Sequence, residues 1–236
     1  MLGRENPDRP RIKGIASMAT REMLAQLVTA YQQVSAQAVV IESTGGVAAF
    51  QRVRDGAPFD FVVLAADAID RLDAAGRLVR ESRVDIARST VSVAVAQGAP
   101  RPDIGSEAAV RDAVLSAGSI GYSTGPSGAH LSGLFMRWGI ADVIASRVVQ
   151  APPGVPVGAL VARGDVALGF QQSSELLHVP GIDIIGTLPS EIQIITVFAA
   201  AICEMSAKQE AARALLTFLR SSAADAARFE HGMLTP

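Results

Sequence analysis

Short apolar runs alternate with amphipathic segments along the N-terminal third of the chain. Three of these runs predict buried strands, at 12–16, 38–42 and 60–65. Each run leads through a small polar loop into a segment with apolar residues at helical spacing, at 20–34, 47–54 and 67–76. This repetition of strand, tight loop and helix predicts a mainly parallel sheet flanked by helices, in which ligands bind beyond the carboxyl ends of the strands.

The pattern changes near the middle of the chain. Two longer strand-like runs, at 90–97 and 192–202, bracket a section with strand–helix units of its own. We therefore expect an α/β fold of two lobes, with 1–88 plus 200–236 in the first lobe and 89–199 in the second. The chain would cross between the lobes twice, and the two crossover strands would form a hinge. A cleft between hinged lobes is a natural ligand site.

The stretch 119–138 has the most distinctive local pattern. An apolar strand end is followed by a turn of small residues and then by apolar positions at helical spacing. This geometry aims several backbone N–H groups and the positive end of a helix dipole at one point, which favours an anion. Ser123, Thr124 and Ser127 add hydroxyl donors to the same turn. The alternative is an ordinary strand–helix loop that happens to be small and polar.

Composition narrows the class of protein. Hydrophobic residues make up 49% of the 236 residues but aromatic residues only 5%, so Ala, Val, Ile and Leu build the core. Such a composition is typical of α/β folds with covered parallel strands. The 21 basic and 23 acidic residues nearly cancel. This balance argues against a surface for nucleic acid or for an anionic membrane.

Several kinds of chemistry are excluded by the residues available. The single Cys203 excludes an intrachain disulfide and a cysteine-based zinc site. The three histidines are scattered and the acidic residues lack ligand spacing, so we predict no metal site. Motifs for nucleotide or serine-hydrolase chemistry are also lacking, so we predict no cofactor.

The apolar segments also bear on location. The longest apolar run, at 194–203, is too short to span a membrane. Residues 1–13 are polar and lack the apolar region of a signal peptide. We therefore expect a protein that is not itself membrane-spanning. It would be periplasmic if a leader was removed, and cytoplasmic otherwise.

Several motifs, taken in order, resemble the type II periplasmic-binding-protein superfamily and its molybdate-binding-protein-like branch. The motifs that carry the resemblance are Ala16-Ser-Met-Ala-Thr20, Glu42-Ser-Thr-Gly-Gly46, Ala57-Pro-Phe-Asp-Phe-Val-Val-Leu-Ala-Ala-Asp67, Pro126-Ser-Gly128, Leu160-Val-Ala-Arg-Gly-Asp-Val-Ala167 and Phe229-Glu-His-Gly-Met233. The resemblance implies a solute-binding protein that captures a small anion between its lobes. It also implies a monomer that delivers the anion to an ABC-transporter permease.

The resemblance further implies which residues contact the anion, because family members hold it with hydroxyls and backbone amides from several loops. The predicted ligand-binding residues are Ser17, Met18, Ser43, Thr44, Gly45, Arg88, Ser123, Ser127, Gly128, Gln171 and Gln172. A further loop contact is expected within 153–157. Neutral donors solvate an anion without a fixed countercharge, so they discriminate by size and shape.

Two departures from the family pattern bear on the ligand. Molybdate binders usually present a tyrosine near 170–172, where this chain has Gln171 and Gln172, and Ser127 replaces a common alanine. Glutamine offers donors and an acceptor, which suits an organic acid better than a bare tetrahedral oxyanion. We therefore predict a small carboxylate as ligand. Arg88 could add a bidentate contact to it, or could instead form a structural salt bridge.

The chain also resembles the bacterial aconitate isomerases, which implies an alternative, catalytic function. Moving a proton across an allylic tricarboxylate requires a base within reach of both carbons. His130 and Glu42 are the candidates for this base. Alternatively, His130 lies on a solvated helix face and Glu42 is a salt-bridged strand end. We assign no role to His178 or His231, and binding without catalysis remains our main prediction.

Overall fold

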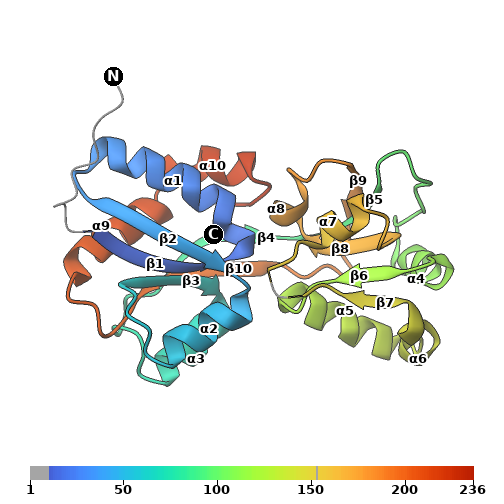
Figure 1. The fold of residues 1–236 in the computed structure, drawn as a ribbon, viewed down its shortest axis with the longest axis horizontal. Coiled ribbons are helices and arrows are strands. Elements are labelled where there is room, and N and C mark those ends of the chain that lie inside the picture. The colour runs from blue at the N-terminus through green and yellow to red at the C-terminus, as the bar shows by residue number, and fades with distance from the viewer. Residues whose placement is uncertain (1–10, 153) are drawn as a thin grey trace.

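The computed structural model describes residues 11–152 and 154–236, which fold into two lobes lying side by side (Figure 1). Each lobe is built on a five-stranded sheet with helices on both faces. The predicted two-lobed α/β fold is therefore confirmed. Strand order is β2-β1-β3-β10-β4 in the first sheet and β7-β6-β8-β5-β9 in the second.

The first sheet is mixed. Its strands are β1 (Arg11–Ser17), β2 (Ala38–Thr44), β3 (Phe61–Ala65), β4 (Val84–Ser89) and β10 (Thr196–Ile202). The β1 strand pairs in parallel with β2 and β3, whereas β10 runs antiparallel to both β3 and β4. All five residues of β3 are buried, because helices cover both faces of this central strand.

Two groups of helices cover the first sheet. On one face lie α1 (Arg21–Val34), α9 (Gln209–Arg220) and α10 (Asp225–Glu230), together with the short η1 (Met18–Thr20) and η3 (Ser222–Ala224). The apolar stripes of α1 and α9 meet in one buried cluster, which includes Leu24, Leu27 and Leu215. On the other face, α2 (Gly46–Arg54) and α3 (Ala66–Ala74) bury Val53, Ile69 and their neighbours.

The second lobe repeats this arrangement. Its strands are β5 (Val91–Ala96), β6 (Ile120–Tyr122), β7 (Val148–Gln150), β8 (Leu168–Gln172) and β9 (Ile182–Thr187). Its helices are α4 (Glu107–Ser116), α5 (Pro126–Arg137), α6 (Ala141–Ile144), η2 (Ala145–Arg147), α7 (Val157–Ala162) and α8 (Ser173–Leu176). The β6 strand is parallel to β7 and β8, and β5 is antiparallel to β8 and β9.

The chain passes between the two sheets twice, from β4 to β5 and from β9 to β10. The run predicted as a strand at 90–97 forms β5, and a separate strand, β4, precedes it. The run predicted as a strand at 192–202 forms β10, which begins only at Thr196. Ser89 and the whole of β10 pair within the first sheet. The lobe division at 88/89 and 199/200 stays a proposal.

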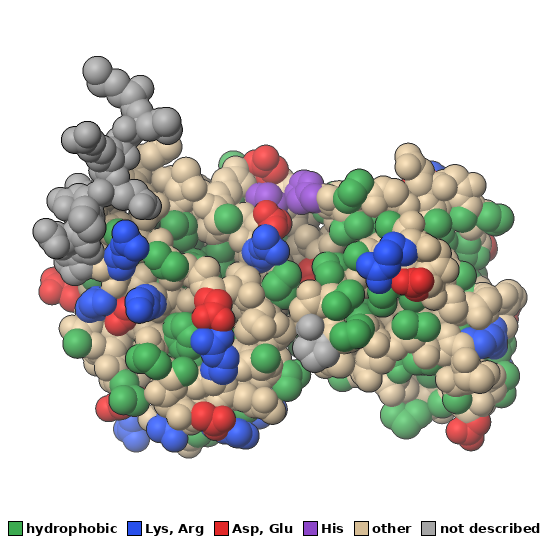
Figure 2. Space-filling view, in the orientation of Figure 1, with side chains coloured by type: hydrophobic (Ala, Val, Ile, Leu, Met, Phe, Trp, Pro, Cys, Tyr) green, Lys and Arg blue, Asp and Glu red, His purple; other side chains and the backbone are tan. Residues whose placement is uncertain are grey.

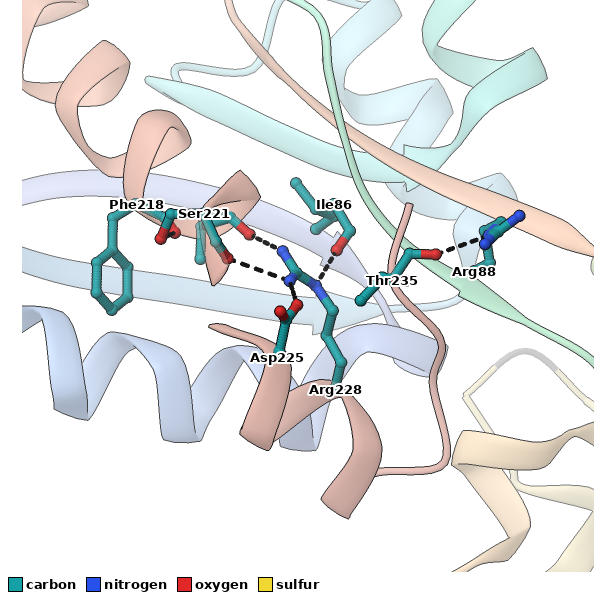
Figure 3. A network of polar contacts seen from close by, with 8 residues as sticks. Ile86, Arg88, Phe218, Ser221, Asp225, Arg228 and Thr235 are labelled. Atoms are coloured by element: carbon teal, nitrogen blue, oxygen red, sulfur yellow. Dashed lines mark hydrogen bonds and ion pairs between the residues drawn. The ribbon is translucent and has the colours of Figure 1, made fainter. Parts of the chain in front are cut away.

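The C-terminal segment is fastened to the first sheet by Arg228, whose side chain is fully buried (Figure 3). Its guanidinium donates to the carbonyl oxygens of Ile86 at 2.6 Å, Leu219 at 2.6 Å and Ser221 at 3.1 Å, and it forms an ion pair with Asp225. One side chain therefore satisfies carbonyls from β4 and from the end of α9.

Replacing Arg228 with Met should destabilise the fold by about 3–5 kcal/mol, because two buried carbonyls, one part-buried carbonyl and one carboxylate lose their donor together. Urea unfolding of both proteins measures the difference. Arg220→Met, at an exposed position on α9, is a matched control. Equal losses in the two variants would contradict the structural role of Arg228.

A pair of histidines joins the two lobes at their junction, where histidine side chains gather in Figure 2. His178 follows α8 in the second lobe and His231 follows α10 in the first, with His178 Nε2 3.2 Å from His231 Nδ1. His231 Nε2 lies 2.7 Å from Gln26 Oε1, and the same amide donates through its nitrogen to Glu230. Because Gln26 Oε1 can only accept, His231 carries its proton on Nε2 and accepts from His178 through Nδ1.

This direction of hydrogen bonding makes the contact sensitive to pH. Burial, followed by the charge of His178, lowers the pKa of His231 from its ordinary value. The neutral form is therefore favoured in the folded protein. The stability that it contributes is present above the ordinary histidine pKa and is lost as the pH falls through the lowered one.

Between about pH 7.5 and pH 5, the native protein should therefore lose more stability than His231→Gln, in which this group no longer titrates. Denaturant unfolding at several pH values measures both losses. Parallel curves for the two proteins would show that His231 does not couple protonation to folding.

Candidate functional site

A cavity of about 860 Å³ lies between the lobes. From the first lobe its wall receives the turn after β1, the start of α2 and the junction of β3 with α3. From the second lobe it receives the turn before α5, the segment before α7 and the end of β8. Most of these positions lie at the carboxyl ends of parallel strands, where α/β sheets bind their ligands.

The three helices of nine or more residues that begin at this wall have no side-chain cap. The residues before their first turns are Gly45 for α2, Ala65 for α3 and Gly125 for α5, and none of the three caps its helix through a side chain. The first N–H groups of a helix have no partner within the helix and carry its positive dipole end. The wall therefore presents backbone donors and positive potential from both lobes, an arrangement suited to an anion.

Hydroxyl groups lie beside these helix starts. Ser17 follows β1, and its side chain accepts weakly from Ala19 N at 3.3 Å, which leaves its own proton free to donate. In the other lobe, Ser123 Oγ and Ser127 Oγ are 3.3 Å apart. Gly128 lies just inside α5, where an added Cβ would come within 1.6 Å of the Ser123 carbonyl oxygen. Gly128 thus permits the tight packing of this turn on the helix.

The two glutamines at the end of β8 are held by different partners. Gln171 Oε1 accepts from Val157 N at 2.8 Å, so its amide nitrogen points the other way and donates to Glu175 Oε1 at 2.8 Å. Gln172 reaches the first lobe by donating to Thr196 Oγ1 at 2.8 Å. Its Oε1 is buried and has no protein partner among the described residues.

Glu175 is a wall residue to which the sequence analysis assigned no role. It follows β8 on the one-turn helix α8 and is only partly exposed. Burial of the carboxyl raises its pKa to about 7, against the opposing effect of the hydrogen bond from Gln171. The only signal in the sequence was a glutamate five residues after the apolar run at 166–170, and such a position does not reveal burial.

Charged side chains lie on the first-lobe side of the wall. Arg71 pairs with Asp67 at 3.4 Å and stacks its guanidinium 4.7 Å from the centre of the Phe50 ring. Arg54 pairs with Asp55 at 2.9 Å. Because exposed ion pairs of this kind contribute little stability, both arginines can turn toward an anionic ligand at small cost.

His130, a candidate base, also lines the cavity. Its Nε2 lies 2.7 Å from the carbonyl oxygen of Ile192, so this nitrogen carries a proton and donates it. His130 therefore links α5 to the returning segment of the chain. The other candidate base, Glu42, forms an exposed ion pair with Arg52, whose hydrogen bond lowers the pKa of the carboxyl. Glu42 is absent from the described cavity lining and is the salt-bridged strand end that was its alternative.

The cavity brings together most of the residues predicted from the sequence. Those on its wall are Ser17, Met18, Gly45, Ser123, Ser127, Gln171 and Gln172. Of the loop predicted at 153–157, residues 154–156 line the cavity, whereas 153 falls outside the described residues. Ser43, Thr44, Gly128 and Arg88 are not among the described lining residues.

Arg88 is the clearest departure from the prediction. Its Nε donates to the carbonyl oxygen of Thr235 at 2.7 Å (Figure 3). Its backbone also pairs with Leu234 in both directions. Arg88 therefore holds the C-terminal segment against β4, away from the described cavity lining. Its described side-chain partner is a carbonyl oxygen, whereas the alternative to a ligand contact was a salt bridge to a carboxylate.

Two further properties concern membranes and metals. Within 11–152 and 154–236, no helix has the length and apolar character needed to cross a membrane. The same residues contain no group of three or more His, Cys, Asp or Glu side chains placed to hold a metal ion.

Comparison with known proteins supports the resemblance seen in the sequence. The chain is 41% identical over 182 residues to an aconitate isomerase of a Pseudomonas species, which covers 77% of this chain and 70% of the relative. The fold of this chain matches that of the periplasmic molybdate-binding protein of Azotobacter vinelandii with a TM-score of 0.79. The two sequences are 21% identical, and the match covers 96% of this chain and 100% of the other.

A second solved structure also has a similar fold. The substrate-binding domain of a putative molybdenum ABC transporter from Clostridium difficile aligns with a TM-score of 0.73 and 16% identity, covering 96% of this chain and 99% of that domain. Residues 12–234 match the family described as "Bacterial extracellular solute-binding protein". The chain belongs to this family of bacterial extracellular solute-binding proteins.

Proposed function

We propose that the cavity captures a small organic acid with more than one carboxylate. The observation that carries this proposal is the convergence of three uncapped helix starts on one cavity, two from the first lobe and one from the second. Each start offers donors and positive potential to a negative group. Because the starts belong to both lobes, a ligand with carboxylates at two ends would contact both.

The size and chemistry of the wall favour an organic acid over an inorganic oxyanion. A volume of about 860 Å³ lies in the range of sites for small organic ligands, and a tetrahedral oxyanion would fill only a small part of it. Arg54 and Arg71 at the wall supply positive charge for an additional carboxylate.

Family membership supports a location outside the cytoplasmic membrane and delivery of the ligand to an ABC-transporter permease. In this role, ligand contacts made by both lobes favour the closed arrangement, and closure excludes water from the captured acid.

A second candidate function is isomerisation of aconitate or a related unsaturated acid. The 41% identity to an aconitate isomerase favours it, and so does the presence of two titratable side chains, Glu175 and His130, on the cavity wall. Shifting a proton across an allylic acid requires such a group beside the ligand.

Thermal-shift measurements should show that tricarballylate, citrate or trans-aconitate raises the melting temperature, whereas molybdate and sulfate do not. A ligand present at about 100 times its Kd stabilises the folded state by about 2.7 kcal/mol. Stabilisation by molybdate alone would overturn the organic-acid proposal.

A pair of variants tests whether the acid occupies this cavity. Ser17→Ala should weaken the affinity for the stabilising acid by about 1–3 kcal/mol, because it removes a donor from a desolvated charge. Thr44→Ala is the matched control, since Thr44 pairs beside Ser17 in the sheet but lies off the described lining. Calorimetric titration measures both. Unchanged affinity in Ser17→Ala would place the ligand elsewhere.

Incubation with trans-aconitate tests the second candidate. We expect formation of cis-aconitate, with incorporation of deuterium when the reaction runs in heavy water. Absence of both turnover and deuterium incorporation, under conditions in which trans-aconitate binds, would leave solute capture as the sole function.

A further inference from the structure

We propose that Glu175 meets the bound acid as a neutral carboxyl group, so that ligand binding takes up a proton at this residue. This inference rests on the proposed capture of an organic acid and assigns one residue of the site a specific part in it. The protonation state of the Glu175 carboxyl determines how the affinity for the acid depends on pH and which charge the acid must carry.

The first support is the position of the carboxyl. Glu175 lies on α8, which packs against η1 of the first lobe as well as against β5, β8 and α7 of the second. The carboxyl therefore lies where the two lobes meet around the cavity, and it lines that cavity. A ligand held between helix starts from both lobes would lie beside it.

The second support is the absence of a compensating charge. The elements named above that pack against α8 contain no Lys, Arg, His, Asp or other Glu within their described residues. The other titratable or charged side chains on the cavity wall are Arg54, Asp67, Arg71 and His130. No described ion pair joins any of them to Glu175. Burial without a countercharge favours the neutral form of a carboxyl.

The third support is the fixed orientation of its one partner. Gln171 Oε1 accepts from the backbone N–H groups of Val157 and Gly158, at 2.8 and 3.4 Å. The amide nitrogen is therefore committed to Glu175 Oε1. The hydrogen bonds of the described residues leave Glu175 Oε2 unoccupied, so a proton on Oε2 can be donated to a carboxylate oxygen of the ligand.

The electrostatics then give the direction of the coupling. In the free protein the carboxyl titrates near neutral pH, because its pKa is about 7. A ligand carboxylate beside it raises that pKa further, since like charges disfavour ionisation. Binding above neutral pH therefore requires uptake of a proton, and affinity falls with rising pH, by up to about tenfold per pH unit.

Calorimetric titration with tricarballylate tests this coupling, because a saturated tricarboxylate cannot be isomerised during the measurement. At about pH 8, heats measured in buffers of different ionisation enthalpy should show uptake of about 0.9 proton by the native protein. Glu175→Gln retains the hydrogen bond from Gln171 and should show uptake close to zero. The affinity of the native protein should fall about tenfold or more between pH 6.5 and pH 8.5, and that of the variant should stay nearly constant.

Glu210→Gln, which removes an exposed glutamate from α9, is the matched control and should behave as the native protein. If tricarballylate binds the native protein without proton uptake, or if Glu175→Gln takes up as many protons as the native protein, the inference about Glu175 is wrong while acid capture stands. If neither tricarballylate nor any other organic acid binds, acid capture and the inference fail together.

Discussion

The proposed ligand site depends on backbone N–H groups at three helix starts that, among the described residues, have no side-chain cap. At the starts of α2, α3 and α5 the residue before the helix is Gly45, Ala65 or Gly125, none of which has a side chain able to cap the first turn. Capping residues would satisfy these donors internally and would stabilise each helix by about 1 kcal/mol. Their absence at three helix starts around one cavity leaves that hydrogen-bonding capacity available to the proposed ligand. The topology then makes the donors converge, because helices that follow parallel strands begin at the same edge of a sheet.

The wall contains little fixed charge at the end of β8. Gln171, Gln172 and Glu175 lie together at the end of β8, and the amide of Gln171 is occupied on both sides. A buried cation here would bind any anion of suitable charge, whereas amides and a neutral carboxyl distinguish ligands by where donors and acceptors lie. The arginines of the wall lie instead among exposed ion pairs, where their charge is partly screened. In the proposed capture, the amides and the carboxyl at the end of β8 would thus select the ligand, and the arginines of the wall would attract its negative charge.

The sequence predicted what is local and missed what depends on distant partners. The apolar runs of β1, β2 and β3 and their small loops are local features, and the structure places the loop residues Ser17 and Gly45 at the cavity wall. Arg88 could not be assigned, because its partner lies 147 residues away and is a backbone carbonyl. Glu175 was overlooked for a similar reason. Its burial results from contacts of α8 with both lobes, and a single-turn helix leaves no periodic pattern in the sequence.

The contacts between the two lobes bear on the hinge closure that the proposed capture requires. Each of the four buried apolar clusters is confined to one lobe, apart from residues of the crossover segment. Contacts between the lobes include polar pairs such as Gln172 with Thr196 and His178 with His231. Polar contacts exchange readily with water, and their net contribution is about 1 kcal/mol each. In the proposed capture, closure would therefore cost little and gain little by itself, and the ligand that contacts both walls would decide between the open and closed arrangements.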